Sequence, residues 1–273
     1  MNNQELSLIA KNVRKNILSM IHTANSGHPG GSLSAVEIMT YLYFEEMNIS
    51  SPTDENRDYF ILSKGHAAPV LYSTLMEKGF LDKNLIPTLR QINSKLQGHP
   101  DMNKIPGIEA STGSLGQGLS IANGIALSLK LDKKENRVFA LLGDGEIQEG
   151  MIWEAAMLAS HYGLSNVTAI LDRNGLQIDG KNEDVMNIEP VEEKWTAFGW
   201  HVIRICGHDI EQLRKAFEER KKINDKPVII IADTVKGKCV SFMENKASWH
   251  GKAPNAEEYN TALKEIEEFG GDK

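Results

Sequence analysis

Residues 138–174 read VFALLGDGEIQEGMIWEAAMLASHYGLSNVTAILDRN and contain two apolar runs, 138–142 and 167–171. Both runs have the composition of strands that are buried on both faces of a parallel sheet. Between them lies a helical pattern that ends at Gly163 and has its apolar positions at Ile152, Trp153, Ala156 and Ala159. The segment is therefore predicted to be a strand, a glycine-rich turn, a helix and a second strand.

Polar residues follow each of these two predicted strands. Gly143-Asp144-Gly145 comes after the first, and Asn174 stands after the second, with 28 residues between Gly145 and Asn174. The carboxyl ends of parallel strands share one sheet edge, which is where open α/β sheets bind ligands. A carboxylate and an amide oxygen suit Mg²⁺ with bound phosphates, and a glycine lets the backbone approach a diphosphate. A tight turn alone would explain the glycines but not the paired asparagine.

The composition is that of a globular protein, with 41% hydrophobic and 25% charged residues and a net charge of -7. This charge provides no basic field for nucleic acid or an anionic membrane. No apolar run approaches the roughly 20 residues of a membrane span, and residues 1–10 lack a signal-peptide pattern. Cys206 and Cys239 have no Cys or His at ligand spacing. We expect a cytoplasmic protein with free thiols and neither a nucleic-acid nor a membrane partner.

Helical patterns alternate with short apolar runs along the whole chain, which predicts an α/β fold with a doubly wound parallel sheet flanked by helices. Residues 1–273 are expected to form a single domain. Further strands are expected at 201–205 and 228–234 with a helix through Ile210, Leu213 and Phe217 between them, and further helical stripes run over residues 6–21, 36–43, 119–129 and 259–269.

Four of the eight histidines stand beside glycine or proline, outside the periodic segments: His28, His66, His99 and His250. Irregular backbone at the ends of elements is where sites are commonly built, although any one of these side chains could simply bond its own loop. The other histidines lie in or beside helix and strand patterns and are expected to be structural: His22, His161, His201 and His208. No histidine spacing supports a zinc site.

The segment 111–118, STGSLGQG, opens a predicted helix with three glycines. Its exposed amides could serve an anion or a flat ring, and a close packing turn explains the same glycines equally well. The segment differs from the dinucleotide-binding fingerprint, and no strand clearly precedes it.

With these features together, the chain resembles the amino-terminal, thiamine diphosphate-binding section of transketolase over essentially all of its residues. The motifs that carry the resemblance are 24–30 (ANSGHPG), 62–67 (LSKGHA), 98–100 (GHP), 112–118 (TGSLGQG), 143–150 (GDGEIQEG), 174–180 and His250-Gly251.

The resemblance implies thiamine diphosphate and Mg²⁺ as cofactors, with Ca²⁺ or Mn²⁺ as substitutes for the metal. The implied metal ligands are Asp144, Asn174 and the Leu176 carbonyl. The implied cofactor contacts are His66, Gly113, Ser114, Leu115, Asp144, Gly145, Asn174, Ile178 and His250. The implied catalytic residues are His28, His99, His250 and Glu149, the last at a junction with a second chain. Ser114 stands where many transketolases have proline, which changes loop stiffness more than chemistry.

The implied activity is that of a transferase of carbohydrate metabolism, as in the pentose phosphate pathway. It moves a two-carbon glycolaldehyde unit from a ketose or ketose phosphate to an aldose or aldose phosphate. The chain ends after the family's first domain, so we expect its partner to be a separate carboxyl-terminal transketolase subunit, in an α2β2 heterotetramer.

Two other functions are compatible with the same residues. Deoxyxylulose phosphate synthase and 2-oxo acid dehydrogenases share the metal motif, and turnover of pyruvate rather than a hydroxyketose would favour them. A noncatalytic nucleotide-binding module is a different class, and tighter binding of ATP than of thiamine diphosphate would favour it.

Overall fold

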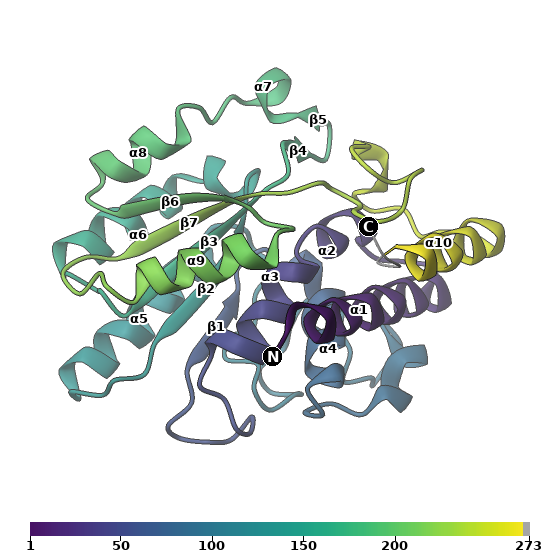
Figure 1. The fold of residues 1–273 in the computed structure, drawn as a ribbon, viewed down its shortest axis with the longest axis horizontal. Helices are drawn as coiled ribbons and strands as arrows, with labels where there is room; N and C mark the ends of the chain where they lie inside the picture. Colours follow the sequence, from purple (N-terminus) through teal and green to yellow (C-terminus); the bar gives the residue numbers. More distant parts are fainter. Residues whose placement is uncertain (270–273) are drawn as a thin grey trace.

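The computed structural model describes residues 1–269, so residues 270–273 of the expected single domain lie outside it. Its centre is a five-stranded sheet in the order β1-β2-β3-β7-β6, with every neighbouring pair parallel (Figure 1). The strands are β1 (Tyr59–Leu62), β2 (Val138–Gly143), β3 (Val167–Arg173), β6 (His201–Cys206) and β7 (Val228–Asp233). The expected fold class is confirmed. The single-domain reading stays a prediction.

The pairing register brings the carboxyl ends of the central strands to one edge. Leu62 of β1 pairs with Leu141 of β2, and Gly143 at the end of β2 pairs with Asp172 near the end of β3. Arg173, the last residue of β3, pairs in turn with Asp233, the last residue of β7. The loops that follow these strands therefore begin side by side.

Buried side chains from β2 alternate between two cores, as the period of a strand requires. Phe139 and Leu141 join one core, and Val138, Ala140 and Leu142 join the other. The first core includes side chains from α1 (Asn3–Ala24), α2 (Pro29–Leu33), α3 (Val36–Tyr41), α4 (Ala68–Glu77), α9 (Ile210–Arg220) and α10 (Ala256–Glu268). The second includes side chains from α5 (Gln117–Leu131), α6 (Gly150–His161) and α8 (Val191–Ala197).

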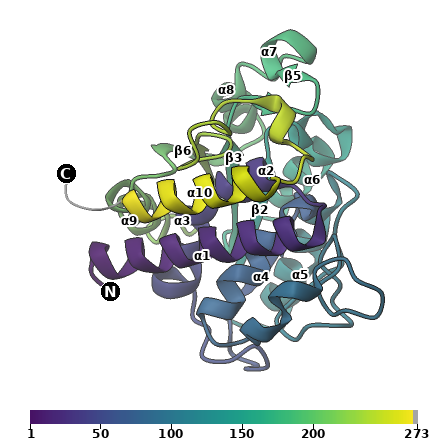
Figure 2. The same ribbon diagram turned by 90° about the vertical axis from the view of Figure 1, so that its right-hand side faces the viewer.

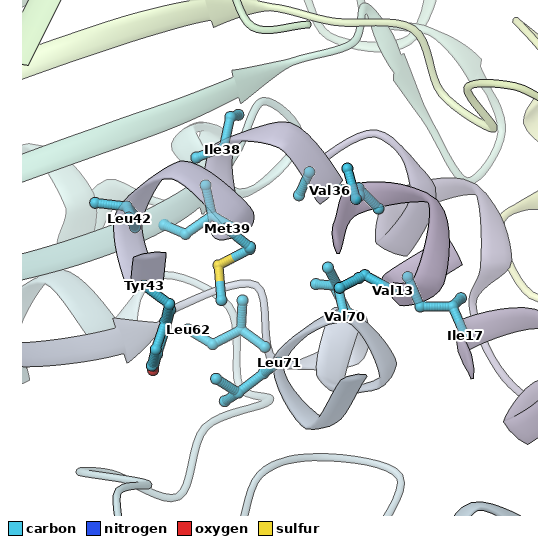
Figure 3. Packing of buried hydrophobic residues seen from close by; sticks show 14 of the residues in the cluster. Val13, Ile17, Val36, Ile38, Met39, Leu42, Tyr43, Leu62, Val70 and Leu71 are labelled. Carbon is cyan, nitrogen blue, oxygen red and sulfur yellow. The ribbon is translucent and has the colours of Figure 1, made fainter. Parts of the chain in front are cut away.

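The amino-terminal helices pack closely on one another in the first core. Figure 3 shows Val13 and Ile17 of α1 next to Val70 and Leu71 of α4, with Met39 of α3 above them. Helices α1 and α10 lie side by side (Figure 2). Both begin with a capping box, from Asn2 and Glu5 in α1 and from Asn255 and Glu258 in α10.

Several elements were not predicted from the sequence, among them β1 and α4. The strand β1 has four residues and the helix α4 buries every residue from Ala68 to Met76, so neither has a polar face that would produce a period. The stripe at 36–43 also differs from a single α-helix, because α3 continues as a π-helical turn, Leu42–Glu46. At the other end of the chain, Phe269 lies beyond the last residue of α10 and is half exposed.

Smaller elements complete the described chain. A two-stranded antiparallel ribbon, β4 (Leu176–Gln177) and β5 (Gly180–Lys181), and the short helix α7 (Asn182–Val185) follow β3. Short helices of the 3₁₀ type cover Gly65–Ala67, Lys83–Thr88, Glu146–Gln148 and Ala247–Trp249. Within residues 1–269, none of the helices is both long and apolar enough to cross a membrane.

Substitution of Leu141 tests how much this core contributes to the stability of the fold. Its side chain is fully buried in the centre of the sheet, whereas Leu131 at the end of α5 is 74% exposed. Leu141→Ala should lower the free energy of unfolding by about 2–5 kcal/mol through lost burial and an unfilled cavity. Leu131→Ala should change it by less than about 0.5 kcal/mol. Urea denaturation measures both, and equal effects would show that Leu141 is not a core residue in solution.

Candidate functional site

A cavity of about 190 Å³ lies at the sheet edge where β1, β2 and β3 end. The loops after these strands contribute to its walls, together with the loop before α5 and the segment after β7. Nine of the site residues expected from the sequence line it: His66, Leu115, Asp144, Gly145, Glu149, Asn174, Leu176, Ile178 and His250. Residues from separate loops of the chain therefore meet at one place.

Asp144 is the most buried of the expected metal ligands, at 2% exposure. One carboxylate oxygen accepts from the Gly145 amide at 3.0 Å, and the other accepts from the Gly175 amide at 2.6 Å and from Arg173 Nη1 at 3.3 Å. Asn174 lies in the same turn, where its amide oxygen accepts from the Leu176 amide at 3.2 Å. Backbone amides thus hold both side chains in place: those of Gly145 and Gly175 donate to the Asp144 carboxylate, and that of Leu176 donates to the Asn174 amide oxygen.

The chemistry of these donors fits a divalent cation. Burial raises the pKa of Asp144, and the nearby Asp172 carboxylate raises it further. A carboxylate that is buried beside a second carboxylate gains from an added positive charge. The side-chain and backbone oxygens available here are the ligands that Mg²⁺ prefers.

Three of the four loop histidines form one cluster. The ring centroids of His28 and His66 lie 5.3 Å apart, those of His28 and His250 lie 5.3 Å apart, and those of His66 and His250 lie 5.1 Å apart. Within the described chain, His28 Nδ1 is buried and has no hydrogen-bond partner. The cluster therefore brings together His28, from near the start of the sequence, and His250, from near its end.

These histidines are held in the neutral form. Burial is the main cause, and it lowers the pKa of His28 to about 4 and that of His250 to about 3. Neighbouring positive charges act in the same direction: Arg90, His99 and Lys236 at His28, and Lys236, His28 and Lys64 at His250. Burial likewise lowers the pKa of His66 well below its usual value. Near neutral pH the three rings are therefore unprotonated.

Two lysines of the site were not predicted from the sequence. Lys64 is buried and its Nζ donates to the Asp172 carboxylate and, at 2.7 Å, to the Gly31 carbonyl. Lys236 Nζ lies 3.0 Å from His250 Nδ1, and burial lowers the pKa of Lys236 to about 8. Both follow a buried strand at the carboxyl edge, as Asp144 and Asn174 do, and that position is the signal that could have identified them.

Glu146 is a third site residue that was not predicted from the sequence. It is 2% exposed, and its carboxylate accepts from Ser63 Oγ, from the Gly116 amide at 2.9 Å and from the Gly143 amide at 3.0 Å. The carboxylate therefore ties the loop before α5 to the ends of β1 and β2. Burial raises the pKa of Glu146.

Glycines make close packing possible around the loop before α5. A Cβ at Gly118 would lie 2.5 Å from Ser63 Cβ, and one at Gly65 would lie 2.6 Å from the Gly113 nitrogen. Gly113 has a φ of 139° and lies against His99, since a Cβ there would be 2.7 Å from the His99 ring. His99 thus contacts the expected ring-binding loop, although it does not line the cavity described above.

The remaining expected residues lie at the rim. Glu149 is exposed at the start of α6 and packs beside Gly116. Ser114 is exposed and accepts from Gln117 at 3.2 Å, and Ile178 is 66% exposed at the tip of the β4–β5 ribbon. An apolar side chain at the mouth of a polar cavity is available to a ligand or a second chain.

The histidines expected to be structural include two with clear packing roles. His22 stacks on Tyr259 with ring centroids 4.4 Å apart. The His208 ring bonds Glu37 through Nδ1 and accepts the Val235 amide through Nε2. Both cysteines are free.

This fold and this site define an α/β domain with a polar, histidine-lined cavity at the carboxyl edge of its sheet. The family profile described as "Transketolase, thiamine diphosphate binding domain" matches residues 6–270. The chain belongs to the transketolase family, and the expected resemblance is confirmed.

Relatives of similar length are named as transketolase subunits. The chain is 43% identical over 267 residues to a subunit of the apulose-4-phosphate transketolase of Phocaeicola vulgatus, which covers 97% of this chain and 95% of the relative. It is 42% identical over 260 residues to "6-deoxy-6-sulfo-D-fructose transketolase subunit SqwG" of Clostridium sp. (strain MSTE9), with 94% of each chain covered.

Other relatives are longer. Human transketolase is 44% identical over 252 residues, which are 91% of this chain and 40% of that protein. The crystal structure of transketolase from Campylobacter jejuni superposes with a TM-score of 0.91 at 34% identity, covering 98% of this chain and 43% of that one. The chain therefore spans about two fifths of these longer transketolases.

The neutral histidine cluster leads to a pH prediction. NMR titration of the chain should show His28 and His250 unprotonated at pH 6, with protonation only near pH 4 and pH 3, because burial disfavours the charged rings. Titration of either ring near pH 6.5 would show that the site is open to water.

The same lowered pKa values predict how the free energy of unfolding changes with pH. The unfolded histidines have a pKa of about 6.5 and take up protons before the folded ones do. Stability that is present above pH 6.5 should therefore be lost as the pH falls toward 4 for His28 and toward 3 for His250.

Proposed function

We propose that this chain is the thiamine diphosphate- and Mg²⁺-binding subunit of a transketolase that consists of two different chains. The single observation that carries the proposal is the cavity that Asp144, Asn174, His66 and His250 line together, with His28 packed against both histidines. In this proposal, Asp144, Asn174 and the Leu176 carbonyl hold the metal. His66, Gly145 and His250 contact the diphosphate, and Lys236 provides positive charge beside it.

The rings of the cofactor are assigned to the loop before α5 and to the β4–β5 ribbon. Gly113, Ser114 and Leu115 would support them on one side, with Ile178 on the other. Thiamine diphosphate, when bound, supplies the nucleophilic carbon and the electron sink that breaking a ketose C2–C3 bond requires. The protein itself has to hold the rings, exclude water and move protons.

The neutral histidines provide the proton transfers. When the C2–C3 bond of a ketose breaks, the hydroxyl on C3 loses its proton, and His28 or His250 can accept it because each is neutral near pH 7. Lys236 Nζ lies 3.0 Å from His250 Nδ1 and would hold the orientation of that ring. His99 is assigned to the terminal hydroxyl of the donor sugar, and Glu149 to the junction with the second subunit.

The proposed reaction is transfer of a glycolaldehyde unit from a ketose to an aldose. The relatives named as subunits include transketolases of apulose-4-phosphate and of 6-deoxy-6-sulfo-D-fructose, so sugars with a phosphate or a sulfonate group are the proposed substrates. The relatives' names also support a partner that is a separate carboxyl-terminal subunit, and we propose an α2β2 assembly in the cytoplasm.

Substitution of Asp144 tests the proposed metal site. Asp144→Ala removes a ligand charge at the sheet edge and should weaken Mg²⁺-dependent binding of thiamine diphosphate by more than the roughly 10–100-fold that loss of an outer-shell partner costs. The control is Asp179→Ala, at an exposed position of the neighbouring ribbon. Calorimetry on the assembled enzyme measures both, and unchanged affinity in a folded Asp144 variant would remove this residue from the metal site.

The two-chain proposal has its own test. We expect two-carbon transfer from a ketose phosphate only when this chain is mixed with its partner, because Ile178 and Glu149 at the rim are exposed and available to a second chain. The assay compares this chain, the partner and the mixture, and light scattering gives the mass of the complex. Full activity of this chain alone would contradict the proposal.

A further inference from the structure

One of the histidines expected to be structural is bonded through both of its ring nitrogens. His208 lies between β6 and α9, directly before the residue that caps α9. Its Nε2 accepts the Val235 amide at 2.8 Å, and its Nδ1 lies 2.9 Å from a carboxylate oxygen of Glu37. A backbone amide can only donate, so the proton of the neutral ring is on Nδ1 and is donated to Glu37. The two bonds fix both the tautomer and the orientation of the ring.

Glu37 is a fixed anchor for this ring. It belongs to α3 and is buried, at 8% exposure, and its other carboxylate oxygen pairs with Arg14 of α1, which is 3% exposed. The carboxylate therefore has a cation on one oxygen and the His208 N–H on the other. Displacing it would leave buried polar groups without partners, which is costly.

A glycine brings the His208 loop against the end of β7. A Cβ at Gly207 would lie 2.6 Å from Thr234 Cγ2 and 3.0 Å from Ala232 Cβ, so a larger residue would push the two segments apart. The Gly207 amide also donates to the Asp233 carbonyl at 2.8 Å. The loop is thus held directly beside the segment that follows β7.

That segment, residues 234–237, is tied to three different parts of the fold. The Thr234 amide donates to the Arg173 carbonyl at 3.1 Å, and the Gly237 amide donates to the Gly30 carbonyl at 3.0 Å. The Val235 amide is held instead by a side chain, that of His208. His208 therefore provides the bond that lies next to Lys236 in the sequence.

Lys236 has little freedom to compensate for a shift of its backbone. It is 2% exposed and lines the cavity, where its Nζ lies 3.0 Å from His250 Nδ1. Its stem packs along Gly30, since a Cβ there would lie 3.0 Å from Lys236 Cγ and 3.1 Å from Cε. With the stem confined in this way, the position of the backbone at residues 235 and 236 decides where the ammonium group lies.

We propose that His208 is a positioning residue of the site: by holding the Val235 amide, it fixes the backbone from which Lys236 reaches the cavity. It thereby sets the place of the ammonium group beside the diphosphate. This inference rests on the proposed function, which supplies the ligand. His208 acts through Val235 rather than by contact with the ligand, and its bond to Glu37 serves to orient the ring.

Two substitutions separate the two bonds of the ring. In His208→Asn, the short amide can still donate to Glu37 from about the place of Nδ1, but it does not reach Val235. In His208→Gln, the longer side chain places its amide oxygen near the place of Nε2, where it can accept from Val235. Each variant loses one of the two hydrogen bonds, so both should lose stability, whereas only His208→Asn releases the backbone next to Lys236.

The first measurement is calorimetric binding of thiamine diphosphate to the assembled two-chain enzyme at a fixed Mg²⁺ concentration. We expect His208→Asn to raise Kd roughly 3–10-fold, as the loss of one hydrogen bond does, and His208→Gln to raise it by less than about twofold. The matched control is His201→Asn at the opposite end of β6, where the ring bonds the exposed Glu219. This control should leave Kd unchanged.

The second measurement needs no cofactor. Hydrogen exchange of the backbone amides of this chain, followed by NMR, should be faster at Val235 in His208→Asn by on the order of 10-fold or more, and close to the wild-type rate in His208→Gln. The Thr234 and Gly237 amides bond backbone carbonyls and should keep their rates in both variants.

The order of the two variants decides the outcome. An equal rise in Kd for both, or a larger rise for His208→Gln, would overturn the proposal in favour of a purely structural role through Glu37. An unchanged Kd in a folded His208→Asn variant would also overturn it. If the wild-type enzyme does not bind thiamine diphosphate, the proposed function fails, and the exchange rate of the Val235 amide still shows whether His208 holds the backbone beside Lys236.

Discussion

The buried ion pair between Lys64 and Asp172 is the interaction on which the site depends. Both side chains are almost completely buried, and the Asp172 carboxylate also accepts from Ser34 and Thr234. Segments that follow β1, α2 and β7 therefore meet at the end of β3. Removing one partner of such a pair leaves a buried charge without compensation, at a cost of about 3–5 kcal/mol. His66 follows Lys64 by two residues and Asn174 follows Asp172 by two, so the pair sets the spacing of the cavity walls.

Above this pair, the electrostatic environment of the histidine side of the site favours anions. No carboxylate is among the charges that shift the pKa of His28, His66, His99 or His250, whereas lysine, arginine and other histidines are. The same positive charges and burial keep the imidazoles neutral, so the site attracts negative ligands while its histidines stay unprotonated. The site thereby combines cations for binding with neutral bases for proton transfer. Both properties arise from burial at one edge of a parallel sheet.

Much of the fold could be predicted from local sequence patterns. The strands expected at 138–142 and 167–171 are β2 and β3 with one or two more residues each, because fully buried parallel strands are continuous apolar runs between glycines and polar residues. Asp144 and Asn174, the proposed metal ligands, could be selected for the same reason, since the end of a buried strand is visible in the sequence. The strand β1 and the helix α4 were not, because four residues are too few for a period and a fully buried helix has no polar face.

The sequence by itself determined the fold class, the family and the identity of the loop residues that bear chemistry. It could not determine that the His28, His66 and His250 rings lie within about 5 Å of one another, since that distance depends on how the loops after α1, β1 and β7 pack. It also gave no reason to select Lys64, Lys236 or Glu146. Charged residues of these types are common on any surface, and only burial and neighbouring charge, which are properties of the packed chain, distinguish those that belong to the site.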